Sequence, residues 1–122
     1  MPLRLTGQAD ADILGILQFT LTTFGERQAG DYAALIQEAL RLVEVDPRRT
    51  SARPRDDIRD GVRSFHVALA SSRRGAASHL IYFIEPEPTE IVVLRVLHEQ
   101  MEPKRRILDS LRRPDTKDDR SS

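Results

Sequence analysis

Cysteine is missing from this chain of 122 residues. Its absence excludes disulfide bonds, thiolate metal sites and cysteine nucleophiles, and it suits a reducing cytoplasm. Long apolar runs are missing too, because none approaches the roughly 18 residues that a membrane-spanning helix requires. The start of the sequence, Met1 to Arg4, lacks the organisation of a signal peptide. We therefore expect a soluble cytoplasmic protein that does not enter a membrane.

The chain also has no net charge and few aromatic residues. The chain has 19 basic and 19 acidic side chains, and only 5% of its residues are aromatic. The zero balance conceals a gradient, because residues 1–46 hold 3 basic and 7 acidic side chains (−4) and residues 47–122 hold 16 and 12 (+4). The arginine clusters in the second part fit either a solvated surface or a docking surface for an acidic partner. No aromatic residue lies among these arginines, so we expect no base stacking and no direct sequence-specific binding of nucleic acid.

The N-terminal part of the sequence predicts a short strand and a long helix. Residues 3–6 alternate between apolar and polar, as in a strand. Thr6 is placed to cap a helix that ends at Phe24, where Gly25 supplies a C-terminal cap. Gly15 inside this helix should allow close approach by another element. The apolar residues of the helix have helical spacing and should form one buried stripe: Ile13, Leu14, Ile16, Leu17, Leu21 and Phe24.

A second helix is expected to follow almost at once and to fold back on the first. It should run from Glu26 to Val45 and should end at Asp46-Pro47, because proline disfavours helix in the preceding residue. A link as short as Gly25 forces the two helices into a hairpin. Tyr32 should lie on the buried face with its hydroxyl at the rim.

The rest of the chain reads as three strands and a short helix. An arginine-rich connector over residues 47–61 leads to a strand over 62–69, in which Phe65, Val67 and Leu69 should be buried, and strands follow over 79–84 and 91–98. Short loops between them predict an antiparallel meander. A basic amphipathic helix is expected over 104–111, followed by a disordered tail over 112–122. The fold class is therefore α+β, in the order β-α-α-β-β-β with a helical hairpin on a small, mainly antiparallel sheet, a short C-terminal helix and one domain over 1–111.

Arg95 interrupts the most apolar segment of the sequence. Six of the seven residues from Ile91 to Leu97 are isoleucine, valine or leucine, so both faces of this strand should be covered. A guanidinium keeps its charge, and burying it without a partner would cost several kcal/mol or more. If the face that Arg95 shares with Ile91, Val93 and Leu97 packs on the hairpin, Arg95 needs a carboxylate from Asp12, Glu38 or Glu44. If that face is open, Arg95 could hold an acidic side chain of a partner.

The order of elements and several local signatures resemble the RelE/ParE superfamily of toxins from bacterial toxin–antitoxin pairs, and the ParE-like plasmid-stabilisation branch most of all. The resemblance covers about residues 3–110. It is carried by Phe24-Gly25 with Gln28-Ala29 and Tyr32, Gly61 to Phe65, His79 to Tyr82, and Leu94 to His98 with Met101.

The superfamily contains two kinds of toxin, and the sequence departs from one of them. RelE-like members cleave messenger RNA on the ribosome with basic side chains and commonly a tyrosine. Here His79 stands where such RNases usually carry an arginine, no tyrosine follows Met101, and Tyr82 lies on the face of Leu80 and Ile84 and reads as core. ParE-like members inhibit DNA gyrase without catalysis and are neutralised by a ParD-like antitoxin, whose C-terminal segment wraps the sheet and the hairpin.

The resemblance therefore implies a gyrase-inhibiting toxin that forms a hetero-oligomer with its antitoxin. The alternatives are a RelE-like endonuclease and a non-toxic, antitoxin-bound member of the fold. We expect no catalytic set, no metal and no cofactor. The candidates for contacts with antitoxin or target are cations and histidines of the sheet and the C-terminal helix: Arg63, His66, His79, Arg95, His98, Lys104, Arg105 and Arg106.

Overall fold

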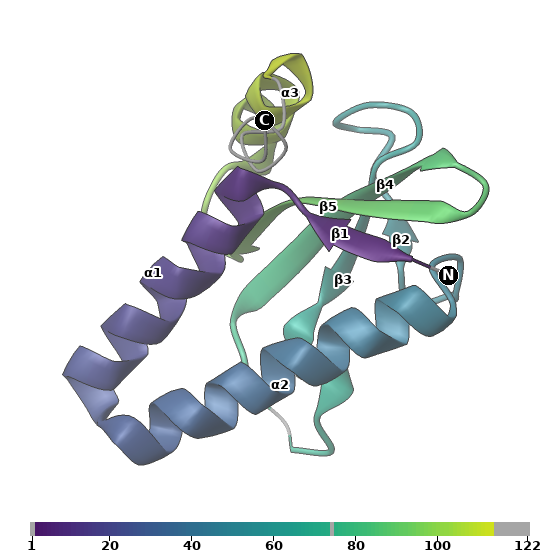
Figure 1. Cartoon of the computed structure of the whole chain (residues 1–122). Coiled ribbons are helices and arrows are strands. Elements are labelled where there is room, and N and C mark those ends of the chain that lie inside the picture. Colours follow the sequence, from purple (N-terminus) through teal and green to yellow (C-terminus); the bar gives the residue numbers. More distant parts are fainter. Residues whose placement is uncertain (1, 74, 114–122) are drawn as a thin grey trace.

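The chain folds into one mixed sheet with helices on both of its faces, as the computed structural model in Figure 1 shows. The structure describes residues 2–73 and 75–113. Its elements follow the expected order, and the α+β class is confirmed. They are β1 (Leu3–Leu5), α1 (Gly7–Phe24), α2 (Glu26–Val45), β2 (Arg53–Pro54), β3 (Arg63–His66), the 3-10 helix η1 (Val67–Ala70), β4 (His79–Glu87), β5 (Glu90–His98) and α3 (Pro103–Arg112).

The sheet has the strand order β1-β5-β4-β3-β2. The predicted meander is confirmed, since β3 pairs antiparallel with β4 and β4 antiparallel with β5. β1 adds to the outer edge of β5 in the parallel direction, with Leu3 opposite Ile91. β2 lies inside the segment that we expected to be a plain connector, and it extends the other edge of the sheet by pairing with β3.

Thr6 fixes the junction between β1, α1 and β5. Its side-chain oxygen accepts a hydrogen bond from Ala9 N at 3.1 Å and donates one to the Leu94 carbonyl at 3.0 Å. Its backbone N–H donates to the Val93 carbonyl at 3.1 Å. The predicted N-cap is confirmed, and it also anchors the start of α1 to the sheet.

Gly25 serves as the hinge of the helical hairpin. Its φ of +98° is a conformation that favours glycine, and its N–H donates to the Leu21 carbonyl at 3.0 Å to close α1. α2 then runs over the predicted residues and ends before Asp46-Pro47. The expected close approach at Gly15 is wrong, because a methyl group added there would meet no atom within 4 Å.

The predicted apolar stripe of α1 is only half buried. Ile13, Ile16 and Leu17 pack against the core, but Leu14, Leu21 and Phe24 are 59%, 47% and 59% exposed. In Figure 1 the C-terminal end of α1 lies beyond the edge of the sheet, so α2 is its main neighbour there. A sheet that is too narrow for an 18-residue helix leaves the remaining apolar side chains uncovered.

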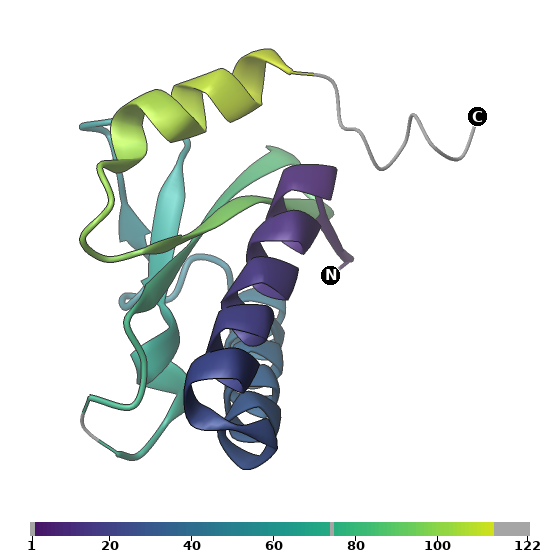
Figure 2. The ribbon, with the colours of Figure 1, turned by 90° about the vertical axis from the view of Figure 1, so that its left-hand side faces the viewer.

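The sheet separates two apolar clusters. The hairpin cluster lies under α1 and α2 and includes Phe65, Phe83 and Ile91. The α3 cluster lies on the other face, where Ile107 of α3 and Ile58 of the connector cover the strands. Figure 2 shows the hairpin to the right of the strands and α3 crossing above them. Both faces of β5 are covered as predicted, and its aliphatic residues from 91 to 97 are at most 4% exposed.

A β-bulge in β5 changes which residues share a face. Tyr82 pairs with Arg95 but Phe83 pairs with Val93, so Leu94 is an extra residue in β5. As a result Val96 joins the hairpin cluster and Leu97 joins the α3 cluster. Arg95 and Leu97 still share a face, opposite Tyr82 and Leu80, but the expectation that Arg95 shares its face with Ile91 and Val93 is wrong.

Two element boundaries also differ from expectation. The strand predicted over 62–69 stops at His66, and η1 turns Leu69 outward, where it is 53% exposed. α3 includes Arg112, which we had assigned to the tail, and the rest of that tail from residue 114 lies outside the described residues. In the part of the chain that the structure describes, no helix has the length and apolar character needed to span a bilayer.

Candidate functional site

One end of the sheet gathers the three histidines. His79 at the start of β4 pairs with His98 at the end of β5, and the centroids of their rings lie 5.3 Å apart. The strands that carry His66 and His79 pair with each other, but the two histidines are not opposite each other, because His66 lies opposite Leu80. Nor does His79 face the open side of the sheet, since its Nδ1 lies 2.6 Å from the Tyr32 hydroxyl of α2.

Burial and a contact with Tyr32 define the surroundings of His79. The Tyr32 hydroxyl accepts a hydrogen bond from Ser78 N at 3.3 Å and also meets His79 Nδ1, where the tautomer of His79 decides which group donates. Burial, assisted by repulsion from His98 and His66, lowers the pKa of His79 from 6.5 to about 4. His79 is therefore neutral at pH 7, and its Nδ1 is already engaged by Tyr32.

The other two histidines use the same nitrogen for structural contacts. His66 Nδ1 accepts from Ala68 N at 3.1 Å, and His98 Nδ1 accepts from Gln100 N at 3.1 Å. The Nε2 of His66 lies 2.8 Å from the Glu99 carboxylate, a contact that is the main reason why the pKa of Glu99 falls below 4.5. In the ranges 2–73 and 75–113, no three histidine or acidic side chains converge in a way that could hold a metal ion.

Arg95 forms an ion pair inside the fold. Its guanidinium donates two hydrogen bonds to the Asp12 carboxylate, at 2.7 and 2.9 Å, and Asp12 also accepts from Val96 N at 3.0 Å. The two side chains are only 19% and 15% exposed. Of the two expected environments, the structure shows the closed one, with Asp12 rather than Glu38 or Glu44 as the partner. Arg95 could meet an acidic partner protein only by breaking this pair.

Arg63 and Tyr82 are also occupied by contacts within the chain. Arg63 donates to the Ala52 carbonyl at 2.8 Å, which ties the connector to β3. Tyr82 is 3% exposed, which confirms that it belongs to the core. The Arg55 guanidinium lies 5.5 Å from the centroid of the Tyr82 ring and 3.4 Å from its hydroxyl. No pattern in the sequence indicates this contact, because the two residues are far apart along the chain.

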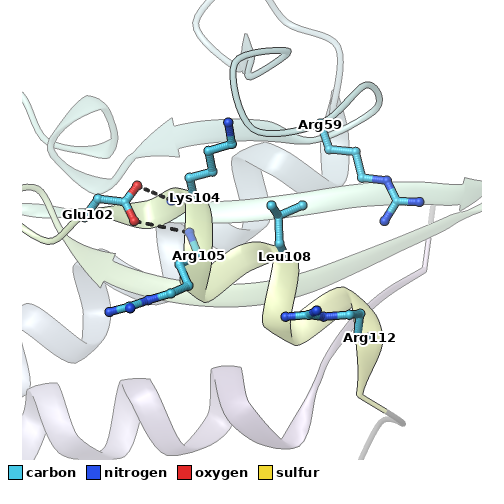
Figure 3. Close-up of a pocket in the computed structure, with 6 residues that line it drawn as sticks. All are labelled: Arg59, Glu102, Lys104, Arg105, Leu108 and Arg112. Atoms are coloured by element: carbon cyan, nitrogen blue, oxygen red, sulfur yellow. Dashed lines mark hydrogen bonds between the residues drawn. The ribbon is translucent and has the colours of Figure 1, made fainter.

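The cations of α3 border a solvent-filled hollow, drawn in Figure 3. Glu102 caps the helix by accepting from Lys104 N at 2.7 Å and from Arg105 N at 3.2 Å. The hollow has a volume of about 530 Å³, and we call it the basic hollow; its lining residues are Arg59, Glu102, Lys104, Arg105, Leu108 and Arg112. Arg106 is outside it and donates to the Glu102 carbonyl at 2.7 Å. Lys104 and Arg105 were candidates from the sequence, but Arg59 and Arg112 were not.

A second surface lies on α1, where Leu14, Leu21 and Phe24 remain exposed. Seven and three residues separate them, so they follow one side of the helix, and we call them the α1 stripe. Together they leave three large apolar side chains on one side of the hairpin. Exposed apolar groups that follow one side of a helix are characteristic of protein–protein contact sites.

Comparisons with known proteins agree with this fold. Residues 3–103 match the family model described as the ParE toxin of the type II toxin–antitoxin system parDE. Toxin ParE1 of Caulobacter vibrioides is 29% identical over 100 residues, which cover 82% of this chain and 91% of that protein. A chain of the chromosomal ParDE system from P. aeruginosa superposes with a TM-score of 0.62 and 22% identity, over 80% of this chain and 95% of that one, and this likeness concerns the fold. Since the family model spans β1 to β5 and reaches the first residue of α3, the chain belongs to the ParE family of type II toxins.

Proposed function

We propose that this ParE-family toxin acts by inhibiting DNA gyrase and that a ParD-like antitoxin neutralises it in a hetero-oligomer. The observation that carries the proposal is the family match over residues 3–103, which includes the whole sheet and the hairpin. Binding of gyrase would place the action of the toxin in the cytoplasm. In this proposal the protein works by fitting a surface of its target and not by catalysing a reaction.

The side chains of the sheet support a binding role. Cleavage of RNA requires a group that accepts a proton and cations that neutralise the phosphate. The guanidinium of Arg95 is held by Asp12, the Tyr82 ring is buried, and the Nδ1 of His79 is engaged by Tyr32. Each of these groups would have to give up a contact within the fold before it could meet a substrate.

The antitoxin is proposed to cover the α1 stripe. The hairpin exposes Leu14, Leu21 and Phe24 along one side of α1, and their burial by a partner would be favourable by about 25 cal/mol per Å² of apolar surface. An amphipathic segment of the antitoxin laid along α1 would bury them. The candidate contacts His66 and His98 lie at the end of the sheet, and they would meet the antitoxin only if it extends past the hairpin.

Induced expression in bacteria tests the proposed target. The expected result is growth arrest with loss of negative supercoiling in a reporter plasmid, while protein synthesis measured by labelled amino acid continues in the first minutes. Coexpression of the antitoxin should restore growth and supercoiling. Early arrest of translation with unchanged supercoiling would instead identify a ribosome-dependent endonuclease, and normal growth would identify a non-toxic member of the family.

A further inference from the structure

We propose that the basic hollow of α3 is the docking site for an acidic segment of the toxin's protein target. This inference rests on the proposed function, because it concerns the chemistry that the target presents to the toxin. The hollow is distinct from the α1 stripe, since α3 covers one face of the sheet and the hairpin covers the other. An antitoxin seated on α1 would therefore leave room for separate recognition at α3.

Charge is the first argument for an acidic occupant. Of the residues that the structure describes, four cations line the basic hollow against one carboxylate, that of Glu102. The N-cap hydrogen bonds lower the pKa of Glu102, so it stays ionised, and both of its oxygens already accept backbone N–H groups. The hollow therefore has a net charge of about +3 and attracts anions.

The cations are available to a partner. Among the described residues, no carboxylate lies within ion-pair distance of Arg59, Lys104 or Arg105. Asp57 is near enough for Lys104 to lower its pKa, but Arg55 binds it at 3.0 Å. Arg112 approaches Asp109 only to 3.9 Å, and its side chain is 75% exposed.

The floor of the hollow favours a peptide over a nucleic acid. Leu108 lies among the cations in Figure 3, and it is partly buried against the α3 cluster. An aliphatic side chain of a partner could contact Leu108 while neighbouring carboxylates meet Lys104 and Arg105. None of the lining residues within the ranges 2–73 and 75–113 is aromatic, so they offer no platform on which a base could stack.

The helix that carries these side chains is firmly seated. Ile107 is fully buried, and Ser110 donates a hydrogen bond to the Gln8 side chain at 2.7 Å. Lys104, Leu108 and Arg112 follow one another at intervals of four residues, so they share one side of α3. The backbone that carries the cations is thus prearranged, so binding a partner would cost little backbone freedom.

A binding assay with the full chain tests the chemistry directly. The probe is a fluorescent peptide of about twelve residues, made of aspartate and glutamate with one central leucine. Its binding to the toxin is measured by fluorescence anisotropy. The double variant Lys104→Glu/Arg105→Glu should bind it at least about tenfold more weakly, whereas Arg106→Glu should bind within about threefold of the wild type, since Arg106 lies outside the hollow. Replacing the leucine of the peptide by glycine should also weaken binding.

Three outcomes of this assay would overturn the inference. Because the double variant changes the charge of α3 by −4 and Arg106→Glu by −2, a loss in Arg106→Glu of half or more of the logarithmic loss in the double variant would mean that only the overall charge of α3 matters. Tighter binding of a DNA duplex of equal charge, lost in the same double variant, would make the hollow a nucleic-acid site. No binding of the peptide by the wild type at low salt would exclude an acidic docking segment.

A growth assay links the hollow to the target. Circular dichroism must first show that Lys104→Glu/Arg105→Glu folds like the wild type. This variant should then need at least about tenfold more inducer than the wild type to arrest growth, and it should still copurify with the antitoxin. If the wild type is toxic and the double variant is equally toxic, the inference fails while the proposed function stands. If the wild type is not toxic, the proposed function fails, and the peptide assay alone decides whether the hollow binds acidic segments. Loss of antitoxin binding in the double variant would assign the hollow to the antitoxin and would overturn its assignment to the target.

Discussion

Single residues decide where this fold tolerates charge. Arg95 and Asp12 meet in a two-point ion pair between β5 and α1, and Asp12 also holds the backbone N–H of Val96 next to the bulge. The Asp12 carboxylate thus provides hydrogen-bond acceptors both for the Arg95 guanidinium and for a backbone N–H of the irregular strand. A pair that is largely withdrawn from water stabilises little in total, but its loss leaves an uncompensated charge.

Replacing Asp12 should therefore be costly. We expect Asp12→Ala to lower the free energy of unfolding by about 2–3 kcal/mol, because Arg95 and Val96 N both lose their acceptor. Urea denaturation of wild type and variant measures the difference. Arg95→Met in the Asp12→Ala background should recover part of the loss, and a cost below about 0.5 kcal/mol for Asp12→Ala alone would contradict the argument.

His79 should make stability depend on pH. Its pKa is lowered from 6.5 to about 4 in the fold, so between these values the unfolded chain binds a proton that the folded chain does not. Stability should then fall as the pH drops from about 6.5 towards 4, by about 2 kcal/mol for this group after allowance for its partial exposure.

A comparison of the wild type with one variant isolates this effect. His79→Gln keeps an amide near Tyr32 but cannot titrate, so its free energy of unfolding should vary less with pH than that of the wild type above about pH 4.5. Measurements at several pH values between 4.5 and 7 supply both curves. Parallel curves would show that His79 is not the group responsible.

At the scale of elements, glycines inside α1 and α2 lower the helix propensity of the hairpin. A methyl group at Gly15 or Gly30 would meet no atom within 4 Å. We therefore expect Gly15→Ala and Gly30→Ala each to stabilise the protein by about 0.5–1 kcal/mol. Gly25→Ala should do the opposite, because φ is +98° there, and thermal denaturation of the three variants checks both signs.

α3 should prove to be part of the core as well as the carrier of the basic hollow. Ile107 is fully buried against Val92, Leu94 and Leu97, so Ile107→Ala should cost about 2–4 kcal/mol. Lys104→Glu changes an exposed residue in the first turn of the same helix and should change stability by less than about 0.5 kcal/mol. Similar effects of the two substitutions in urea denaturation would mean that α3 does not close the sheet.

At the scale of the whole molecule, the two faces of the sheet carry different kinds of surface. The hairpin exposes the apolar α1 stripe, whereas α3 presents cations around Leu108. The proposed antitoxin and the proposed target would thus be recognised by different physical means. Apolar burial favours a stable complex, and charge favours rapid and salt-sensitive encounter.

Self-association should reveal the α1 stripe. We expect the isolated toxin to associate at high concentration and to remain well dispersed with its antitoxin, because the antitoxin would cover Leu14, Leu21 and Phe24. Leu14→Glu/Leu21→Glu should reduce self-association and abolish copurification with the antitoxin, as followed by size-exclusion chromatography. A wild-type toxin that stays monomeric at high concentration would argue against this role of the stripe.

Local chemistry was sufficient to predict much of the fold. Thr6 caps α1, Gly25 separates the two helices, and Asp46-Pro47 ends α2 where the sequence indicated. The long apolar run of β5 implied cover on both faces, and the structure shows it. These features depend on neighbours within a few residues, so a pattern in the sequence records them directly.

Tertiary structure alone decided the candidate surfaces. The sequence left open whether Arg95 pairs with a carboxylate inside the fold or lies on an open face, and it could not choose Asp12, because the choice depends on where α1 crosses β5. It could not show that the sheet stops short of Leu21 and Phe24, nor that the connector brings Arg59 beside α3. Burial and charge balance are sums over residues that are distant along the chain, so only the packing of the elements determines them.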